Sequence, residues 1–215
     1  MLNNKLICVC CKEQIPSARF LIHSGRIGIC EVCYNTLSPV PADSPMQGSA
    51  SLDYIFSAYY YNEAIRNLIH RYKFYGEYRF SDLFSEMLWE YLENISELKK
   101  YDLITSVPLH RKRLFSRGFN QSELIAKRIS DYSHITYERC IYRTRNTIAQ
   151  SHLGMRDRIH NISDAFIADA KKVKDKKILL FDDIYTTGST MESCANELKS
   201  KGALSVAGIS LSKTY

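Results

Sequence analysis

Apolar residues recur every three or four positions in four segments of the chain, a spacing that places them on one face of a helix. These segments are residues 62–73, 81–93, 120–131 and 191–202. Asn120 and Glu123 have the spacing of a capping box, and Gly202 ends the fourth segment, so both carry helix-terminus signals. We predict four helices whose apolar faces, together with Trp89, belong to the core.

Other segments have the length and composition of strands. They are residues 53–61, 102–108, 134–143, 176–181 and 205–212. The segment 176–181 is a nearly continuous apolar run, which is typical of a strand buried on both faces. Because strands and helices alternate from residue 101 onward, we expect an α/β domain with a mostly parallel sheet flanked by helices.

The first part of the chain differs in composition from the rest. Five of the seven cysteines fall within the first 33 residues, and a Pro/Ser-rich stretch follows at 38–51. We expect a small cysteine module at 1–40, a linker at 41–52 and a second domain at 53–215. Within that domain, residues 53–100 would lead into a core formed by 101–215.

Four cysteines form two C-x-x-C pairs that are separated by 18 residues: Cys8 with Cys11, and Cys30 with Cys33. This spacing is typical of a structural zinc ion held by four thiolates in a small zinc-ribbon-like module. Disulfides and free thiols are the alternatives, and the lack of a secretion signal disfavours disulfides. Cys10 could be a substitute ligand or a spare thiol, and His23 could compete as a ligand.

Composition and charge narrow the function classes. With 45% hydrophobic residues the chain can bury a core, and it has no apolar stretch long enough to span a membrane and no apparent secretion leader. We therefore expect a cytoplasmic protein. Residues 101–160 contain eleven Lys/Arg and five Asp/Glu, a surplus equal to the net charge of +6 of the whole chain. Such a localised surplus favours an anionic partner, either nucleic acid or a phosphorylated small molecule, over general solubility.

The sequence ILLFDDIYTTGST, residues 178–190, combines an acidic pair with a turn suited to phosphate. The turn and the start of the following helix offer a glycine, four hydroxyls and backbone amides: Thr186, Thr187, Gly188, Ser189 and Thr190. Asp182 and Asp183 would repel a phosphate but could hold sugar hydroxyls or a Mg²⁺ ion one sugar-length away. A Walker P-loop is excluded by the lack of Gly-Lys-Ser/Thr. An ordinary capped turn after a strand is the alternative.

Residues 178–190 resemble the phosphoribosyl pyrophosphate (PRPP) signature of the type I phosphoribosyltransferases. The resemblance implies that Thr186–Thr190 bind the 5′-phosphate and that Asp182 and Asp183 meet the ribose hydroxyls. Three upstream stretches, 72–77, 106–126 and 143–166, together with the cysteine pairs, resemble the ComF family. That family joins an N-terminal zinc module to a phosphoribosyltransferase-type domain and is linked to DNA uptake, so other DNA-uptake proteins are expected partners.

The same resemblance assigns roles in two basic segments. The loop after strand 102–108 would bind pyrophosphate through Val107, Pro108, Leu109 and His110, with Arg113 and Arg117 as counter-charges. The segment 143–160 would form a mobile loop that closes over PRPP, and its expected contacts are Arg143, Arg145, Gln150 and Arg156. With Mg²⁺ sharing the charge of PRPP, the candidate catalytic residues are Asp182, Asp183, Arg143 and Arg145. A solvated surface charge is the alternative for each arginine.

Two functions of different class fit the sequence. The first is an enzyme that transfers ribose 5-phosphate from PRPP to an unspecified acceptor and releases pyrophosphate. The second is a non-catalytic module that binds PRPP and single-stranded DNA, for which the tyrosine-rich run 54–61 offers stacking surfaces unless it packs in the core. Nucleobase salvage is a third, less favoured reading. The sequence specifies neither the acceptor nor the oligomeric state.

Overall fold

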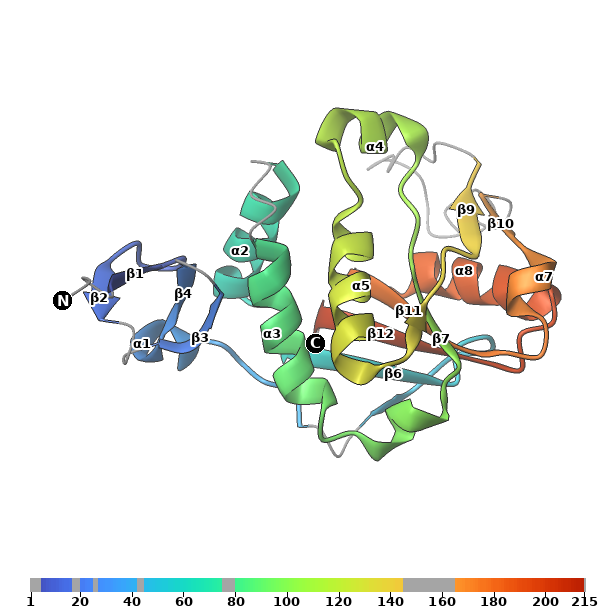
Figure 1. Ribbon diagram of the computed structural model, residues 1–215, viewed down its shortest axis with the longest axis horizontal. Helices are drawn as coiled ribbons and strands as arrows, with labels where there is room; N and C mark the ends of the chain where they lie inside the picture. The colour runs from blue at the N-terminus through green and yellow to red at the C-terminus, as the bar shows by residue number, and fades with distance from the viewer. Residues whose placement is uncertain are drawn as a thin grey trace.

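The computed structural model describes residues 5–16, 20–24, 27–41, 45–74, 80–144 and 165–214. Its two main parts are a six-stranded sheet covered by helices and a small N-terminal sheet (Figure 1). Within the described ranges, no helix combines the length and apolarity that crossing a bilayer requires.

The large sheet has the strand order β5-β6-β12-β11-β7-β8. The strands are β5 (Met46–Gln47), β6 (Tyr54–Tyr60), β7 (Leu103–Ser106), β8 (Thr136–Tyr137), β11 (Lys177–Tyr185) and β12 (Ser205–Lys213). All neighbouring pairs are parallel except β5 with β6. Opposite Phe181 of β11 lie Ser106 of β7 on one side and Ile209 of β12 on the other, so β7 ends directly before the level of Asp182 and Asp183, while β11 continues to Tyr185.

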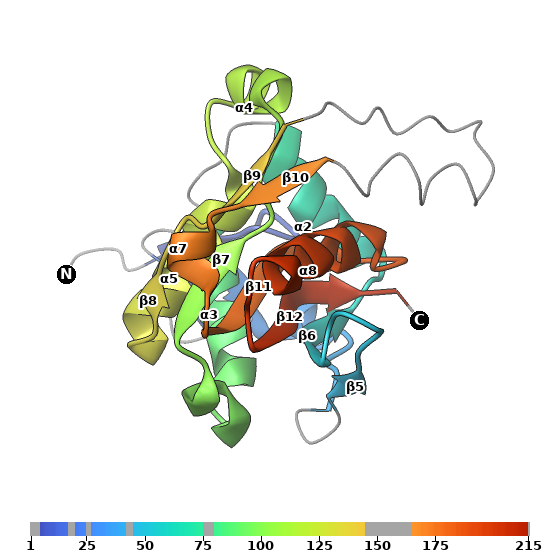
Figure 2. The ribbon, with the colours of Figure 1, turned by 90° about the vertical axis from the view of Figure 1, so that its right-hand side faces the viewer.

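Helices cover both faces of this sheet (Figures 1 and 2). On one face lie α2 (Glu63–Phe74), α3 (Phe80–Leu92) and α5 (Gln121–Ser133), and on the other α8 (Ser189–Ser200), α7 (Ala170–Val173) and the hairpin of β9 (Ile141–Arg143) and β10 (Phe166–Ala168). Alternate residues of β11 supply the two cores: Leu179 and Phe181 face α2, α3 and α5, whereas Ile178 and Leu180 face α8. Both faces of β11 are buried, which explains its continuous apolar run. The predicted fold class is confirmed.

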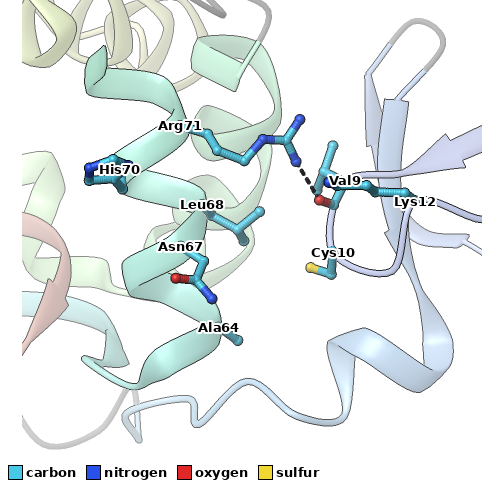
Figure 3. Close-up of a pocket in the computed structure, with 8 residues that line it drawn as sticks. All are labelled: Val9, Cys10, Lys12, Ala64, Asn67, Leu68, His70 and Arg71. Carbon is cyan, nitrogen blue, oxygen red and sulfur yellow. Dashed lines mark hydrogen bonds between the residues drawn. The ribbon is translucent and has the colours of Figure 1, made fainter. Parts of the chain in front are cut away.

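The N-terminal sheet has the order β2-β1-β4-β3. Its elements are β1 (Lys5–Cys8), β2 (Gln14–Pro16), β3 (Phe20–Ser24) and β4 (Ile27–Cys30), followed by the short helix α1 (Glu31–Tyr34). Ile22 and Ile29 join the apolar cluster of α2 and α3. Arg71 of α2 donates from Nη1 to the carbonyl of Val9 at 2.6 Å (Figure 3). The Tyr34 hydroxyl donates to Glu90 of α3 at 3.2 Å. The small sheet therefore packs on α2 and α3.

Several elements differ from the sequence prediction. The segment 134–143 forms two strands in different sheets, β8 and β9, rather than one. The loop after β7 contains a helix, α4 (Arg111–Arg117), and η2 (Ser96–Lys100) precedes β7. The strand predicted at 176–181 continues through the acidic pair to Tyr185. β5 lies inside the segment expected to be a linker.

The predicted core is found with one qualification. Tyr59 and Tyr72 are buried, but Trp89 is only partly buried against the cluster of α2 and α3. Within the tyrosine-rich run, Tyr54 is half exposed while Tyr59 is 3% exposed, so the run is partly core.

Candidate functional site

The turn between β11 and α8 is shaped by one glycine. Gly188 has φ of +73°, and a Cβ added there would lie 2.4 Å from the hydroxyl of Tyr185. A side chain would therefore be both strained and in collision. Gly188 is also the N-cap of α8 and supplies no side-chain cap, while the hydroxyls of Thr187 and Ser189 lie 2.8 Å apart.

A hollow of about 40 Å³ lies over this turn, lined by Asp182 and residues 184–191. Its wall includes the start of α8, where the first amides of a helix have no intrahelical acceptor and attract an anion. The structure thus brings together all five residues predicted to bind phosphate, Thr186 through Thr190, beside the carboxylate of Asp182.

Both aspartates already have polar partners. Asp183, buried with its side chain 9% exposed, forms an ion pair with Lys73 of α2, Nζ to Oδ2 at 2.7 Å. Oδ1 of Asp182 accepts from the Ser122 hydroxyl at 3.1 Å and from the amide of Asp183 at 3.0 Å. Burial first, and then the negative charge of Asp183, raises the pKa of the Asp182 carboxyl well above its usual range.

The loop predicted to bind pyrophosphate begins beside this acidic pair. The amide of Val107 donates to the carbonyl of Phe181 at 2.9 Å, and Asn120 at the start of α5 donates to the carbonyl of Val107 at 3.2 Å. Pro108 and Leu109 continue the loop, and Nδ1 of His110 accepts from the amide of Lys112 at 3.2 Å, capping α4. The loop therefore leaves the carboxyl end of β7 beside the acidic pair of β11, at the edge of the sheet where ligands bind in open parallel sheets.

Three arginines surround this end of the sheet. Arg117 donates to Gln121 at 3.2 Å; burial lowers its pKa, and the charge of Asp183 partly opposes that shift. Arg143 lies with its guanidinium carbon 5.3 Å from the centre of the Phe166 ring. Burial and the charge of Arg113 lower the pKa of Arg143, while Asp182 acts in the opposite direction. Arg113, Arg117 and Arg143 thus share one electrostatic environment with the acidic pair.

Not every predicted residue can be placed. Arg145, Gln150 and Arg156 lie outside the described residues. Conversely, Lys73 and Ser122 touch the acidic pair but were not among the predicted site residues. Both fall within the stretches that resemble the ComF family, but only the folded chain brings α2 and α5 to the end of β11.

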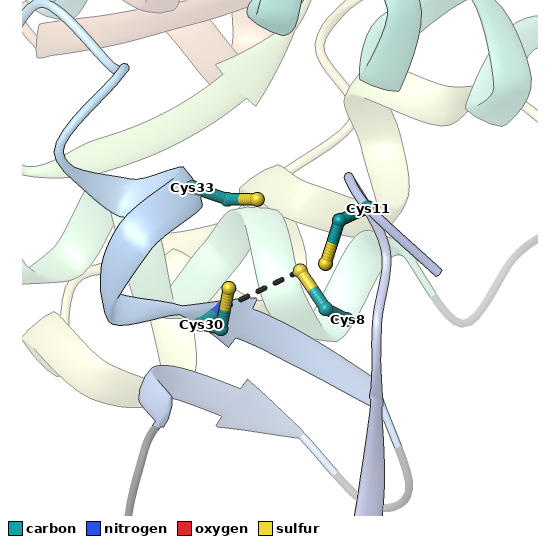
Figure 4. A group of neighbouring side chains, drawn as sticks. All are labelled: Cys8, Cys11, Cys30 and Cys33. Atoms are coloured by element: carbon teal, nitrogen blue, oxygen red, sulfur yellow. Dashed lines mark hydrogen bonds between the residues drawn. The ribbon is translucent and has the colours of Figure 1, made fainter. Parts of the chain in front are cut away.

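The four cysteines of the C-x-x-C pairs converge, as Figure 4 shows. Their sulfur atoms all lie within 4.8 Å of one another, and the amide of Cys30 donates to Sγ of Cys8 at 3.5 Å. Four sulfurs at about 2.3 Å from a tetrahedral ion would lie roughly 3.8 Å apart, so the group could hold a metal ion. Cys10 instead lines a hollow against α2 (Figure 3). The side chain of His23 is outside the described part of the structure.

Comparison with known proteins identifies relatives over most of the chain. The DNA utilization protein YhgH of Escherichia coli is 30% identical over 202 residues, which cover 85% of this chain and 88% of that protein. Competence protein F of Haemophilus influenzae is 27% identical over 204 residues, 91% of this chain and 85% of that protein.

The chain belongs to the ComF family. A further ComF-family relative, competence protein ComFC of Streptococcus pneumoniae, is 31% identical over 151 residues, 70% of this chain and 64% of that protein. No family model matches the chain.

Solved structures similar to this ComF-family chain include an allosteric regulatory enzyme of purine biosynthesis, with 20% identity, a TM-score of 0.42, and coverage of 62% of this chain and 25% of that one. An adenine phosphoribosyltransferase from Thermoanaerobacter pseudethanolicus has 16% identity and a TM-score of 0.41, and the match covers 65% of this chain and 83% of that one.

Proposed function

We propose that this ComF-family protein binds PRPP with Mg²⁺ and transfers its phosphoribosyl group to an acceptor. The observation that carries the proposal is the position of the signature turn: Thr186–Thr190 open α8 directly beside Asp182 and Asp183, at the carboxyl ends of β7 and β11. A phosphorylated ribose matches that arrangement, because its phosphate and its hydroxyls are one sugar-length apart.

In the proposed complex the turn and the amides of α8 bind the 5′-phosphate. Asp182 and Asp183 accept hydrogen bonds from the ribose hydroxyls or hold Mg²⁺, for which Asp183 exchanges its contact with Lys73. The pyrophosphate lies against the loop of residues 107–110, with Arg113 and Arg117 as counter-charges. Arg143, Arg145 and Arg156 complete the charge neutralisation, since arginine suits pyrophosphate oxygens.

The reaction breaks the bond between C1 of the ribose and the pyrophosphate oxygen. The acceptor supplies the electron pair for the new bond to C1 and loses a proton, while pyrophosphate leaves with the electrons of the broken bond. In the proposed complex the carboxylates of Asp182 and Asp183 would stabilise positive charge on the ribose ring in the transition state.

The cysteine module is proposed to hold one structural Zn²⁺ through Cys8, Cys11, Cys30 and Cys33. Four protein ligands complete a tetrahedral shell, so the zinc would stabilise the fold rather than act in chemistry. We propose the module at residues 1–40 and the phosphoribosyltransferase-type domain at 53–215, in a cytoplasmic protein.

The relatives named for competence and DNA utilization support a role in DNA uptake. The basic surplus of residues 101–160 supports contact with single-stranded DNA, so a module that binds PRPP and DNA without catalysis is the second candidate. Other DNA-uptake proteins would be its partners.

Calorimetry with PRPP and Mg²⁺ tests the donor site. Asp183→Asn is expected to weaken Mg²⁺-dependent binding about tenfold or more, since it removes a buried charged acceptor. Asp131→Asn, at an exposed position of α5, is the matched control. Equal affinity of the two variants would refute the assignment.

Pyrophosphate release then separates the candidate functions. Release with single-stranded DNA present supports the enzyme acting in DNA uptake, and PRPP binding without release supports the module. Release with a free nucleobase as the acceptor would favour salvage instead.

A further inference from the structure

A second and larger hollow lies between the cysteine module and α2, on surfaces to which the proposed donor site assigns no role (Figure 3). Its volume is about 370 Å³, within the roughly 300–1,000 Å³ typical of small-molecule sites. One wall is the turn that contains Cys10 and Lys12, and the other is the side of α2 that carries Ala64 and Asn67.

The lining is basic. Lys12, His70 and Arg71 contribute to it, and among the described residues that line it none is Asp or Glu. Arg71 is held in position by its hydrogen bond to the Val9 carbonyl at 2.6 Å and by the Phe80 ring, whose centre lies 4.9 Å from the guanidinium carbon. A fixed positive charge of this kind favours an anionic ligand, because little ordering is left to occur on binding.

The rest of the lining favours more than an inorganic anion. Val9 and Leu68 supply apolar surface, and the side-chain amide of Asn67 offers both a donor and an acceptor. Asparagine amides pair with the donor and acceptor edge of a base such as adenine. The combination of a positioned arginine, a nearby lysine, apolar surface and an amide in one hollow matches a phosphate joined to a nucleobase.

We propose that this hollow binds a nucleotide unit, with its phosphate near Lys12, His70 and Arg71 and its base against Leu68 and Asn67. The unit comes either from a free nucleotide or from single-stranded DNA. The second source rests on the proposed contact with DNA, whereas the first does not.

Two substitutions in the hollow separate the effect of charge from the effect of space, and a third outside it is the control. Lys12→Gln removes one exposed positive charge from the hollow, and Lys99→Gln removes one from η2, which does not line it. Ala64→Met fills the hollow without changing charge and keeps a good helix former in α2. All are made in the full-length, metal-loaded protein, and thermal melting verifies that each variant folds.

Binding of a labelled oligo(dA) and of free dAMP is measured by fluorescence anisotropy, directly and by competition. Lys12→Gln should weaken binding about threefold to tenfold relative to Lys99→Gln, and should reduce the slope of log affinity against log salt by about 0.7 for the oligonucleotide. Ala64→Met should weaken binding of the same ligand. If dAMP binds and both substitutions weaken its binding, the hollow is a free-nucleotide site. If the substitutions weaken only the binding of the oligonucleotide, the hollow is a DNA site.

Equal affinities of the wild type, Lys12→Gln and Ala64→Met would overturn the proposal, as would binding of neither ligand by the wild type. PRPP affinity, measured in parallel, should be unchanged in all variants. If the wild type does not bind PRPP, the proposed donor site is refuted, but the result for this hollow still stands.

Discussion

Lys73 of α2 places its Nζ 2.7 Å from Oδ2 of Asp183, the second acid of the PRPP-like signature. The two residues are 110 positions apart in the sequence, and both are largely buried. The ion pair neutralises one carboxylate of the acidic pair, and it fixes the end of α2 against the end of β11. Any ligand that uses this carboxylate must compete with the ammonium group.

Removing the ammonium should destabilise the fold. Lys73→Met leaves the buried carboxylate of Asp183 without its cation, so the free energy of unfolding should fall by about 1–3 kcal/mol in urea titrations. Arg66→Met on the same helix is the control, because the Arg66–Glu63 pair is exposed and should contribute less than about 0.5 kcal/mol. Equal losses in the two variants would show that the buried pair contributes no more to stability than the exposed pair.

The acidic pair should also make stability depend on pH. The folded-state pKa of Asp182 is raised above its unfolded value by burial and by Asp183, so its favourable contribution is present at low pH and is lost as pH rises through the folded pKa. Asp182→Asn should therefore unfold less readily than the wild type near pH 8, by on the order of 1 kcal/mol, and this advantage should shrink towards pH 5. Urea titrations at both pH values measure it. A constant difference would contradict the raised pKa.

The contacts of the acidic pair show what the sequence could and could not predict. The place of Asp182 and Asp183 directly after the apolar run of β11 and before the turn followed from the local apolar pattern and the turn composition, although the strand itself continues to Tyr185. Their contacts with Lys73 and Ser122 depend on how α2 and α5 pack on the sheet, and no local pattern encodes that. The sequence pattern therefore lacks the long-range packing that brings these side chains to the acidic pair.

Substitution of the turn glycine should affect both stability and PRPP binding. Gly188→Ala places a Cβ at positive φ and 2.4 Å from the Tyr185 hydroxyl, so it should cost more than about 1 kcal/mol and weaken PRPP binding measured by calorimetry. Gly118→Ala is matched in φ, at +77°, but its Cβ would meet nothing within 4 Å. The loss of stability in Gly118→Ala should therefore report the cost of backbone strain alone. Similar losses of stability in both variants would mean that the contact with Tyr185 relaxes at little cost.

Metal analysis should separate the ligand cysteines from Cys10. Elemental analysis of purified Cys10→Ser should give one zinc per chain, as for the wild type, since Cys10 lines the hollow against α2. Cys33→Ser should lose the ion and lower the melting temperature, because the small sheet depends on the metal for a core of its own. Full zinc content in Cys33→Ser would exclude this set of four ligands.

The missed helix α4 has a different cause from the missed contacts. Residues 111–117 have no apolar stripe, and Phe115 is 93% exposed, so periodicity gives no signal. The ends define this helix instead: the side chain of His110 caps its start, and Gly118, with a left-handed backbone, ends it. The division of residues 134–143 into β8 and β9 likewise has a non-local cause, because β8 pairs in the large sheet and β9 pairs with β10. The main helices and strands were predictable because each one buries a periodic face.

The position of β12 has a consequence for how the chain acquires its structure. β12 lies between β6 and β11, and both neighbours precede it in the sequence. During synthesis, those two strands therefore wait with unpaired edges until the central strand emerges and joins them. The waiting edges are open to wrong pairing with other chains, so the nascent protein should be most prone to aggregation, and most in need of chaperones, just before β12 is complete.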